Sequence, residues 1–365
     1  MSEAYGSDGI SKMRWGNASA MERRSVLKML AAAVAAGAAG GFPTPAFADA
    51  ELVVSNWGGK AEEAVMAAFG DAAKEQTGLS LVVDGSGPMP GKVRAMVEAK
   101  HATWDIADIS LGNSGQLGAA GYVEEIDYSI VDKTKVLAGL ATKWGVSNYL
   151  FSYIFAVNED LAKDKAPKTW ADFWNVKKFP GKRALPGSSQ GTLEAALLAD
   201  GVDPAKLYPL DVDRAIAKIK ELKADCIFWK GGAQSEDLLR QGEVVASLMW
   251  SNRAVVVRRE IPSVTWTWDN AILTSSGWCV PKGNPAGKAA AMKFINASLD
   301  PAAQAKVFQI VGMSPSNPAA AALIPAAEQP YNATGFADKQ VRQDDTWYAE
   351  RGDAAEAKYV EAISS

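Results

Sequence analysis

Short apolar runs alternate with segments of helical spacing at the start of the chain's main part. Three runs have the length and composition of buried strands, and two segments between them place apolar residues at helical intervals. Gly78 follows the first of these segments, as expected for a glycine that ends a helix. The order strand, helix, strand, helix, strand predicts a mainly parallel sheet covered by helices. The expected strands are 51–57, 79–83 and 105–110, and the expected helices are 62–77 and 91–100.

A second set of alternating elements follows an apolar crossing segment at 149–158. Thr169 is placed to cap a short helix, on which Trp170 and Trp174 share one face and are expected to pack against the sheet. About 317 residues remain after a 48-residue leader, and chains beyond roughly 250–300 residues divide into domains. We therefore expect two α/β domains. The further elements expected are strands at 183–185 and 227–229 and helices at 192–198, 211–223, 235–241 and 286–299.

The strand expected at 244–249 ends in Trp250, Ser251, Asn252 and Arg253, which are an aromatic ring, two hydrogen-bonding groups and a cation. Ligands of open α/β sheets bind beyond the carboxyl ends of parallel strands, so this stretch is a candidate wall of a binding site. The alternative is a core strand followed by an ordinary loop. Other expected strand ends carry glycine or hydrogen-bonding groups, at Trp57-Gly58-Gly59, Gly85-Ser86-Gly87 and Leu111-Gly112-Asn113-Ser114.

The first 48 residues have the pattern of an export signal. Arg23 and Arg24 precede an apolar segment rich in Ala and Gly, and Ala46-Phe47-Ala48 matches a cleavage site. The pair of arginines indicates the twin-arginine route, and the apolar segment is short for a membrane-spanning helix. We therefore expect a twin-arginine signal peptide at 1–48 and a periplasmic mature protein.

Charge and composition exclude several function classes. The leader carries five Lys and Arg against three Asp and Glu, so its removal changes the net charge from −4 to −6. An acidic protein has no electrostatic basis for binding nucleic acid. His101 is the single histidine and no zinc spacing occurs, so we expect neither a metal nor a cofactor. Cys226 and Cys279 have apolar neighbours and are expected to be buried thiols, although export leaves a disulfide possible.

One short motif raises the question of catalysis. Gly187-Ser188-Ser189-Gln190-Gly191 fits G-x-S-x-G, the pattern around the nucleophile of many serine hydrolases. In those enzymes the catalytic histidine follows the serine, whereas His101 precedes it. A glycine- and serine-rich ligand loop also explains the match. We therefore expect no enzyme activity and keep a serine hydrolase as a distant alternative.

Several motifs resemble the spermidine/putrescine-type solute-binding proteins of bacterial ABC importers. They occur in the family's order over nearly all of residues 51–365: NWGG, WDIADIS, TWADFWNVKKFPG, QGEVVASLMW, SGWCVPKGNP and GMSPSNPAA. The resemblance implies a type II periplasmic binding protein, in which two mainly parallel α/β domains are joined by hinge strands. It implies crossings near 153–158, 274–279 and 312–318, with one domain from 49–155 and 277–315 and the other from 156–276 and 316–365. The implied partners of the expected monomer are a small-molecule ligand and an inner-membrane ABC permease.

Departures from this family bear on the ligand. Ser188, Gly191 and Ser276 stand where the polyamine pattern has acids, and a buried ammonium group without a paired charge is costly. Arg253 would repel a cation and can pair with a carboxylate through its planar fork. We therefore expect a ligand that bears a carboxylate. A true polyamine binder with relocated acids, Glu236 or Asp269 being candidates, is the alternative, and Arg253 as a solvated helix residue is the alternative for that side chain. The predicted ligand-binding residues are Trp57, Asn113, Ser188, Ser189, Trp250, Asn252, Arg253, Ser275 and Ser276.

Overall fold

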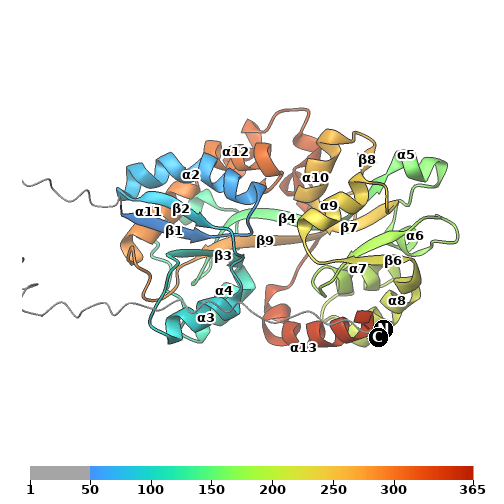
Figure 1. The fold of residues 1–365 in the computed structure, drawn as a ribbon, viewed down its shortest axis with the longest axis horizontal. Coiled ribbons are helices and arrows are strands. Elements are labelled where there is room, and N and C mark those ends of the chain that lie inside the picture. The colour runs from blue at the N-terminus through green and yellow to red at the C-terminus, as the bar shows by residue number, and fades with distance from the viewer. Residues whose placement is uncertain (1–49, 365) are drawn as a thin grey trace, which may run out of the picture. The chain divides into compact units, whose positions relative to one another are not determined.

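Three strands form one half of the central sheet in the order β2-β1-β3, and they are parallel, as the alternating pattern predicted. The structure is a computed structural model that describes residues 50–364, so the predicted signal peptide lies outside the described residues. Figure 1 shows α2 and α12 above this half of the sheet and α3 and α4 below it. The elements are β1 (Glu51–Ser55), α2 (Lys60–Thr77), β2 (Ser80–Asp84), α3 (Pro90–Glu98), β3 (Ile106–Ser110), α4 (Leu111–Ala119), α11 (Lys288–Ser298) and α12 (Pro301–Val311).

The other half of the sheet has parallel strands in the order β7-β5-β6. Trp170 and Trp174 are buried as expected, and the ring of Trp170 packs edge-on against Phe155 with centroids 4.9 Å apart. The side chain of Thr169 caps their helix, α6, by accepting from the backbone N–H of Asp172. The elements of this half are α6 (Trp170–Trp174), β5 (Arg183–Pro186), α7 (Thr192–Ala199), α8 (Val212–Leu222), β6 (Cys226–Trp229), α9 (Gly232–Arg240), β7 (Ala246–Trp250) and α10 (Ser251–Glu260).

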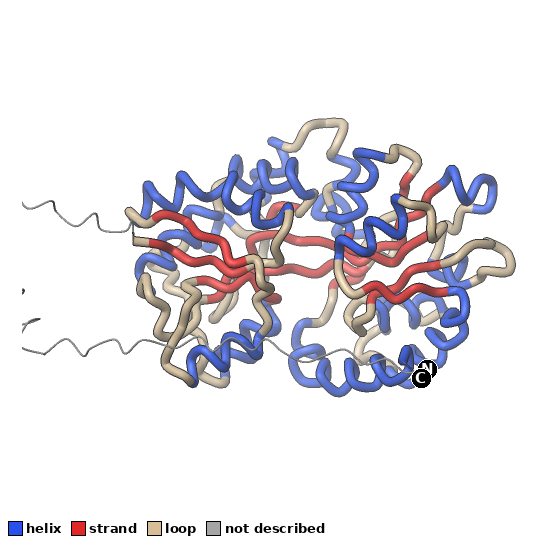
Figure 2. The backbone as a smooth tube through the Cα atoms, viewed as in Figure 1, coloured by secondary structure: helices blue, strands red, loops and turns tan. Residues whose placement is uncertain are grey.

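Two long antiparallel strands, β4 (Val146–Asn158) and β9 (Ile272–Cys279), lie between the halves. Strand β3 pairs antiparallel with β9, and β7 pairs antiparallel with β4, so the full order is β2-β1-β3-β9-β4-β7-β5-β6. Figure 2 shows the strands running through the middle with helices around them. Because β9 and β4 are themselves antiparallel, the carboxyl ends of β1–β3 and of β5–β7 both face the centre of the sheet.

The remaining strands are short, and one of them lies at a predicted crossing. Strand β10 (Ser314–Pro315) pairs with Tyr149 and Leu150 of β4, within the predicted crossing at 312–318. The others are β8 (Val264–Thr265), which pairs with β4, and β11 (Val341–Arg342), which pairs with β9. The structure thus places strands at all three predicted crossings. The domain boundaries built on those crossings stay a prediction.

Sequence analysis did not predict several of the helices, among them α4, α10, α12 and α13 (Asp345–Ser364). Helix α12 carries a signal that could have been recognised, because Asp300 caps it by accepting from Ala303 N and Pro301 occupies its first turn. Helix α13 packs against α4 and α8, and it buries Trp347 and Tyr359. The hydroxyl of Tyr359 donates to the carbonyl oxygen of Pro186, which ties α13 to β5.

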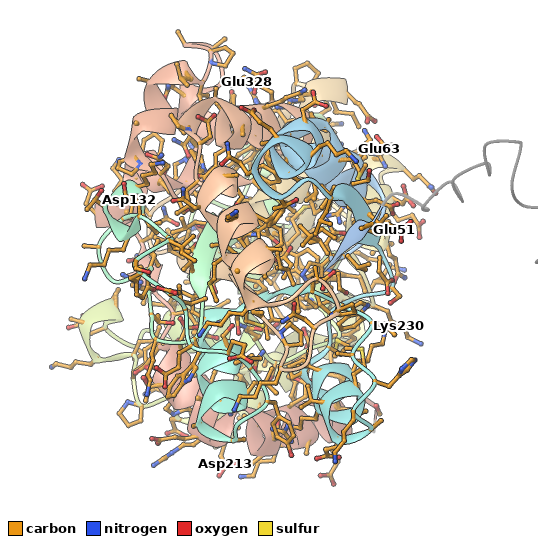
Figure 3. All side chains as sticks on the ribbon, turned by 90° about the vertical axis from the view of Figure 1, so that its left-hand side faces the viewer. Glu51, Glu63, Asp132, Asp213, Lys230 and Glu328 are labelled. Atoms are coloured by element: carbon orange, nitrogen blue, oxygen red, sulfur yellow. The ribbon has the colours of Figure 1, made fainter. Side chains whose placement is uncertain are left out.

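Burial follows the predicted pattern of apolar residues. Phe69 of α2, Phe294 of α11 and Trp278 of β9 are buried, and their rings make edge contacts with centroids 5.8–6.4 Å apart. Cys226 and Cys279 are free thiols rather than a disulfide; Cys279 is fully buried as expected, whereas Cys226 is only partly buried. Charged side chains such as those of Glu63, Asp132 and Asp213 lie at the periphery in Figure 3. Within residues 50–364, no helix is both long and apolar enough to span a bilayer.

Candidate ligand-binding site

A pocket of about 240 Å³ lies where the ends of β3 and β7 meet the middle of β4 and β9. Ser110, the last residue of β3, pairs with Ser276, and Trp250, the last residue of β7, pairs with Tyr153. The two strand ends therefore reach the pocket from opposite halves of the sheet. The lining residues are Trp57, Pro88, Met89, Pro90, Ile109, Ser110, Asn113, Tyr149, Phe151, Tyr153, Gln190, Trp250, Asn252, Arg253, Thr274, Ser275, Ser276 and Met313.

Aromatic rings form one wall of the pocket. Tyr149, Phe151 and Tyr153 are alternate residues of β4, so their side chains share one face of the strand. The centroid of the Phe151 ring lies 6.3 Å from Tyr149, 5.8 Å from Tyr153 and 6.1 Å from Trp250. Trp57, with 45% of its surface exposed, contributes a further ring to the lining. Such a wall suits the apolar part of a ligand.

Sequence analysis did not single out the three β4 aromatics. The strand is buried along both faces, so its near-continuous apolar run does not show which face meets a ligand. The aromatic residues at every second position from Tyr149 were the available signal. Burial raises the pKa of the Tyr149 and Tyr153 hydroxyls above the usual range, so both stay protonated at neutral pH.

Arg253 lies in the first turn of α10, which begins directly after β7. The guanidinium Nη1 donates to Glu236 Oε1 at 2.9 Å, and 17% of the Arg253 side chain is exposed. Its Nε is buried and makes no hydrogen bond to the described residues. Arg253 is therefore a lining residue with donors to spare, rather than the solvated helix residue that was the alternative. The first backbone N–H groups of α10 also have no partner within the helix, and they favour an anion at this end of the pocket.

The part of the pocket near the end of β3 is rich in hydroxyl groups. Ser275 and Ser276 of β9 line it, and both are buried. Asn113 lines it from the first turn of α4, where Ser110 Oγ accepts from Asn113 N at 3.2 Å. Ser276 Oγ donates to the buried carboxylate of Asp108 at 2.5 Å. Burial raises the pKa of Asp108 to about 6, against the opposing effect of that hydrogen bond.

The loop after β5 contributes differently from the expectation. Gln190 lines the pocket, whereas Ser188 and Ser189 are not among the lining residues. The Ser189 N–H donates to Glu356 Oε2 at 2.7 Å, and Ser189 instead lines a neighbouring cavity of about 150 Å³ beside α13. The Ser188 carbonyl accepts from the Thr192 hydroxyl at 3.0 Å. The other seven predicted residues, Trp57, Asn113, Trp250, Asn252, Arg253, Ser275 and Ser276, come together around the pocket. Direct ligand contact by any of the nine stays a prediction.

Arg253 is the one charged residue in the pocket lining that the structure describes, and this lining contains no Asp or Glu. The two acids considered for a relocated polyamine site are engaged elsewhere. Glu236 pairs with Arg253 and with Arg240, and Asp269 is exposed and lies 3.9 Å from the ammonium nitrogen of Lys339. Within residues 50–364, no cluster of three or more His, Cys, Asp or Glu could hold a metal ion.

Comparison with known proteins gives consistent matches. Residues 64–335 match the family described as bacterial extracellular solute-binding protein. The gamma-aminobutyric acid-binding protein of Pseudomonas aeruginosa is 32% identical over 284 residues, which cover 76% of this chain and 80% of that protein. The solved structure of the Atu4243 GABA receptor is 36% identical with a TM-score of 0.79, and the match covers 86% of this chain and 97% of the receptor. The binding protein MotA from A. tumefaciens B6, solved with glucopine, is 30% identical with a TM-score of 0.78 over 86% of this chain and 99% of MotA.

The fold and the family resemblance predicted from the sequence are both confirmed. The relatives are ligand-binding proteins, and one similar solved structure is an ABC transporter substrate-binding protein from Bradyrhizobium japonicum. The two-part α/β architecture with its antiparallel linking strands is that of the type II periplasmic binding proteins. This chain therefore belongs to the bacterial extracellular solute-binding proteins and is a periplasmic substrate-binding protein of the ABC transporter type.

Proposed function

We propose that this protein captures a small ligand that bears a carboxylate and delivers it to the permease of an ABC importer. The observation that carries the proposal is the charge of the pocket lining, in which Arg253 is present and acids are absent among the described residues. A guanidinium pairs with a carboxylate through two parallel hydrogen bonds. The start of α10 adds unpaired backbone N–H groups to the same end of the pocket.

The relatives support a carboxylate-bearing ligand. The Pseudomonas protein and the Atu4243 receptor are named for gamma-aminobutyric acid, which carries a carboxylate. A polyamine carries only ammonium groups, and each would need a paired carboxylate in a desolvated site. Because Ser276 lines the pocket where the polyamine pattern has an acid, a polyamine is the less favoured ligand.

Capture without catalysis is part of the proposal. Ser189 of the G-x-S-x-G match is 2% exposed, and His101 is exposed in the segment between α3 and β3, on the other half of the sheet. A hydrolase needs its base within hydrogen-bond reach of the nucleophile. The glycines and serines of this loop instead bring Gln190 to the pocket.

Delivery requires the two predicted domains to close around the ligand. Residues on the ends of β3 and β7, from opposite halves of the sheet, share one pocket, so a ligand that contacts both favours the closed arrangement. The proposed closing units are 49–155 with 277–315 and 156–276 with 316–365. Export by the twin-arginine route and a monomeric state also belong to this proposal.

A thermal-shift screen of the mature protein tests the function directly. The panel contains mono- and dicarboxylates, amino acids, putrescine, spermidine and neutral sugars. A ligand that binds only the folded state raises the melting temperature, by an amount that grows with the logarithm of its free concentration relative to Kd. We expect carboxylate-bearing compounds alone to do so, and a shift produced only by polyamines or only by sugars contradicts the proposal.

A further inference from the structure

Asp108 is a buried carboxylate directly behind the hydroxyl end of the pocket. It lies on β3, two residues before Ser110, with only 1% of its surface exposed. Its oxygens accept from Ser276 Oγ at 2.5 Å, Tyr149 OH at 3.0 Å and Asn148 Nδ2 at 3.4 Å. Within residues 50–364, no cation is among the groups that lower its pKa. The structure thus holds a buried acid without a counter-charge, and such an arrangement is costly unless something offsets it.

The hydrogen bonds to Asp108 set what the pocket offers a ligand. A hydroxyl has one hydrogen, so when that hydrogen is donated to Asp108 the oxygen presents only lone pairs on its other side. Ser276 and Tyr149 both line the pocket. Their oxygens therefore act as acceptors toward a ligand, and an ionised carboxylate behind them strengthens that character. A donor with positive charge is the group that fits this end.

The polar groups supplied to the pocket by the two halves of the sheet differ in sign. Arg253 and the start of α10 supply donors after the end of β7, and the Asp108-linked hydroxyls supply acceptors near the end of β3. The aromatic wall includes Phe151, whose ring centroid lies 6.3 Å from Tyr149 and 6.1 Å from Trp250. The ring of Phe151 thus lies between Tyr149, which is an acceptor, and Trp250, which is three residues before Arg253. Donors, an aromatic wall and acceptors would suit, respectively, the carboxylate, the short methylene chain and the ammonium group of one ligand.

We propose that Asp108 is the positioning residue for a ligand ammonium group, acting through Tyr149 and Ser276, and that the ligand is an amino acid whose carboxylate faces Arg253. This inference rests on the proposed function, which places a carboxylate at Arg253. It adds a specificity for zwitterions over simple carboxylates. A polyamine site would have carboxylates in the pocket lining. Here the carboxylate of Asp108 lies behind the lining residues Tyr149 and Ser276.

The protonation of Asp108 gives the ligand preference a pH dependence. Burial raises the pKa of Asp108 to about 6, so the group is mainly ionised at pH 7 and mainly protonated at pH 5. The titratable groups beside it are Tyr149 on β4 and Cys279 on β9, and Arg253 is the charged group beyond Tyr149. Burial raises the pKa of Cys279 to about 12 and that of Tyr149 above its usual range, so neither changes charge between pH 5 and pH 8.

Matched ligand pairs test the inference by calorimetric titration. We compare 4-aminobutyrate with butyrate and 5-aminopentanoate with pentanoate, on the wild type and on Asp108→Asn. The wild type should bind the amino member of at least one pair about tenfold to a hundredfold more tightly, as expected for a charge-assisted hydrogen bond. Asp108→Asn should remove this advantage and leave the affinity for the simple carboxylate nearly unchanged.

Asp105→Asn is the matched control. Asp105 is equally buried and precedes β3, but its carboxylate accepts from the backbone N–H groups of Val53 and Ala286 at 2.7 and 2.6 Å. Its loss should leave the ratio of affinities within each pair unchanged. If Asp108→Asn weakens both members of a pair equally, Asp108 has only a structural role and the inference is overturned.

Two further outcomes separate the inference from the proposed function. If simple carboxylates bind the wild type as tightly as their amino partners, the inference fails while the proposed function stands. If no carboxylate of any kind binds, both fail. Should Asp108→Asn not fold, the wild type still decides, because its preference for the amino member must fall severalfold from pH 8 to pH 5. A preference independent of pH overturns the inference.

Discussion

Arg253 Nη1 donates to Glu236 Oε1 at 2.9 Å, so a carboxylate from α9 holds the guanidinium that lines the pocket. Glu236 is 8% exposed and is also contacted by Arg240 at 3.3 Å. One edge of the Arg253 fork is thus fixed by the protein, and its other donors remain for a ligand. This division of donors requires a planar group with several N–H bonds, which an ammonium group is not.

Replacing Arg253 by Lys should therefore weaken binding although the charge is kept. Loss of one charge-assisted hydrogen bond corresponds to about 1.5–3 kcal/mol, or roughly tenfold or more in affinity. Calorimetric titration with 4-aminobutyrate and butyrate measures the change. Arg259→Lys is the control on the same helix, because Arg259 pairs with Glu328 at 2.7 Å, outside the pocket lining. Equal affinities for wild type and Arg253→Lys would remove Arg253 from the site.

Gly232→Ala should weaken binding without any change to a lining residue. A Cβ atom at Gly232 would lie 2.6 Å from Arg253 Nε and 3.0 Å from Trp250 Cζ3, so both side chains must shift. Displacement of the guanidinium should reduce affinity by roughly threefold to tenfold, since part of a charge-assisted hydrogen bond is lost. Gly231→Ala is the control, because a Cβ there meets nothing within 4 Å. Similar affinities for the two variants would contradict the packing described.

Gly191→Ala should destabilise the fold more than Gly201→Ala. Both glycines have positive φ, 75° and 82°, so alanine costs roughly 1–2 kcal/mol at each position. A Cβ at Gly191 would also overlap the ring of Tyr153, whereas one at Gly201 meets nothing within 4 Å. Overpacking should add about 1–3 kcal/mol for Gly191→Ala. Urea denaturation of both variants gives the difference, and equal losses would show that Tyr153 moves aside without cost.

Stability should decrease as pH rises from about 4 to 6, in part because of Asp108. Its folded-state pKa of about 6 exceeds the ordinary aspartate value of 3.8, so the folded protein holds the proton more tightly than the unfolded chain. The proton on Asp108 therefore adds to the free energy of unfolding. This contribution is complete below pH 3.8 and is lost as the pH rises through 6, by up to about 3 kcal/mol. Asp345, whose burial also raises its pKa to about 6, contributes in the same window.

The Asp108 contribution is obtained by difference. Urea denaturation of wild type and Asp108→Asn at pH 4 and pH 8 should show that the variant loses less stability on going to the higher pH. Since Asp345 is present in both proteins, its effect cancels. A pH dependence identical in the two proteins would mean that Asp108 does not change protonation in this range.

Ligand binding should reduce the radius of gyration of the mature protein. The pocket takes residues from both halves of the sheet, and a ligand that contacts both stabilises a closed arrangement. Small-angle X-ray scattering with and without saturating 4-aminobutyrate measures this change. Putrescine is the control ligand, for which we expect no change. An unchanged radius at a ligand concentration shown by calorimetry to saturate the site would favour a rigid binding protein.

The periodicity of apolar residues was sufficient to predict most of the fold. Strands and helices differ in their side-chain period, and that period is a local property of the sequence. The predicted C-cap at Gly78 and the predicted N-cap at Thr169 depend on neighbouring residues only, and both occur in the structure. The end of β7 could be placed in the site for a similar reason, since Trp250 to Arg253 follow a recognisable buried strand.

Other features of the site depend on contacts between residues far apart in the chain. Asp108 is buried against Ser276, which is 168 residues away, and nothing near Asp108 in the sequence indicates that pairing. Gln190 rather than Ser188 or Ser189 reaches the pocket because Glu356 of α13 binds the Ser189 N–H. The face of β4 that meets the ligand is set by its pairing with β7 and β9. Local patterns thus determined which elements form and where strands end, whereas long-range packing decided which side chains face the pocket and which acid lies behind it.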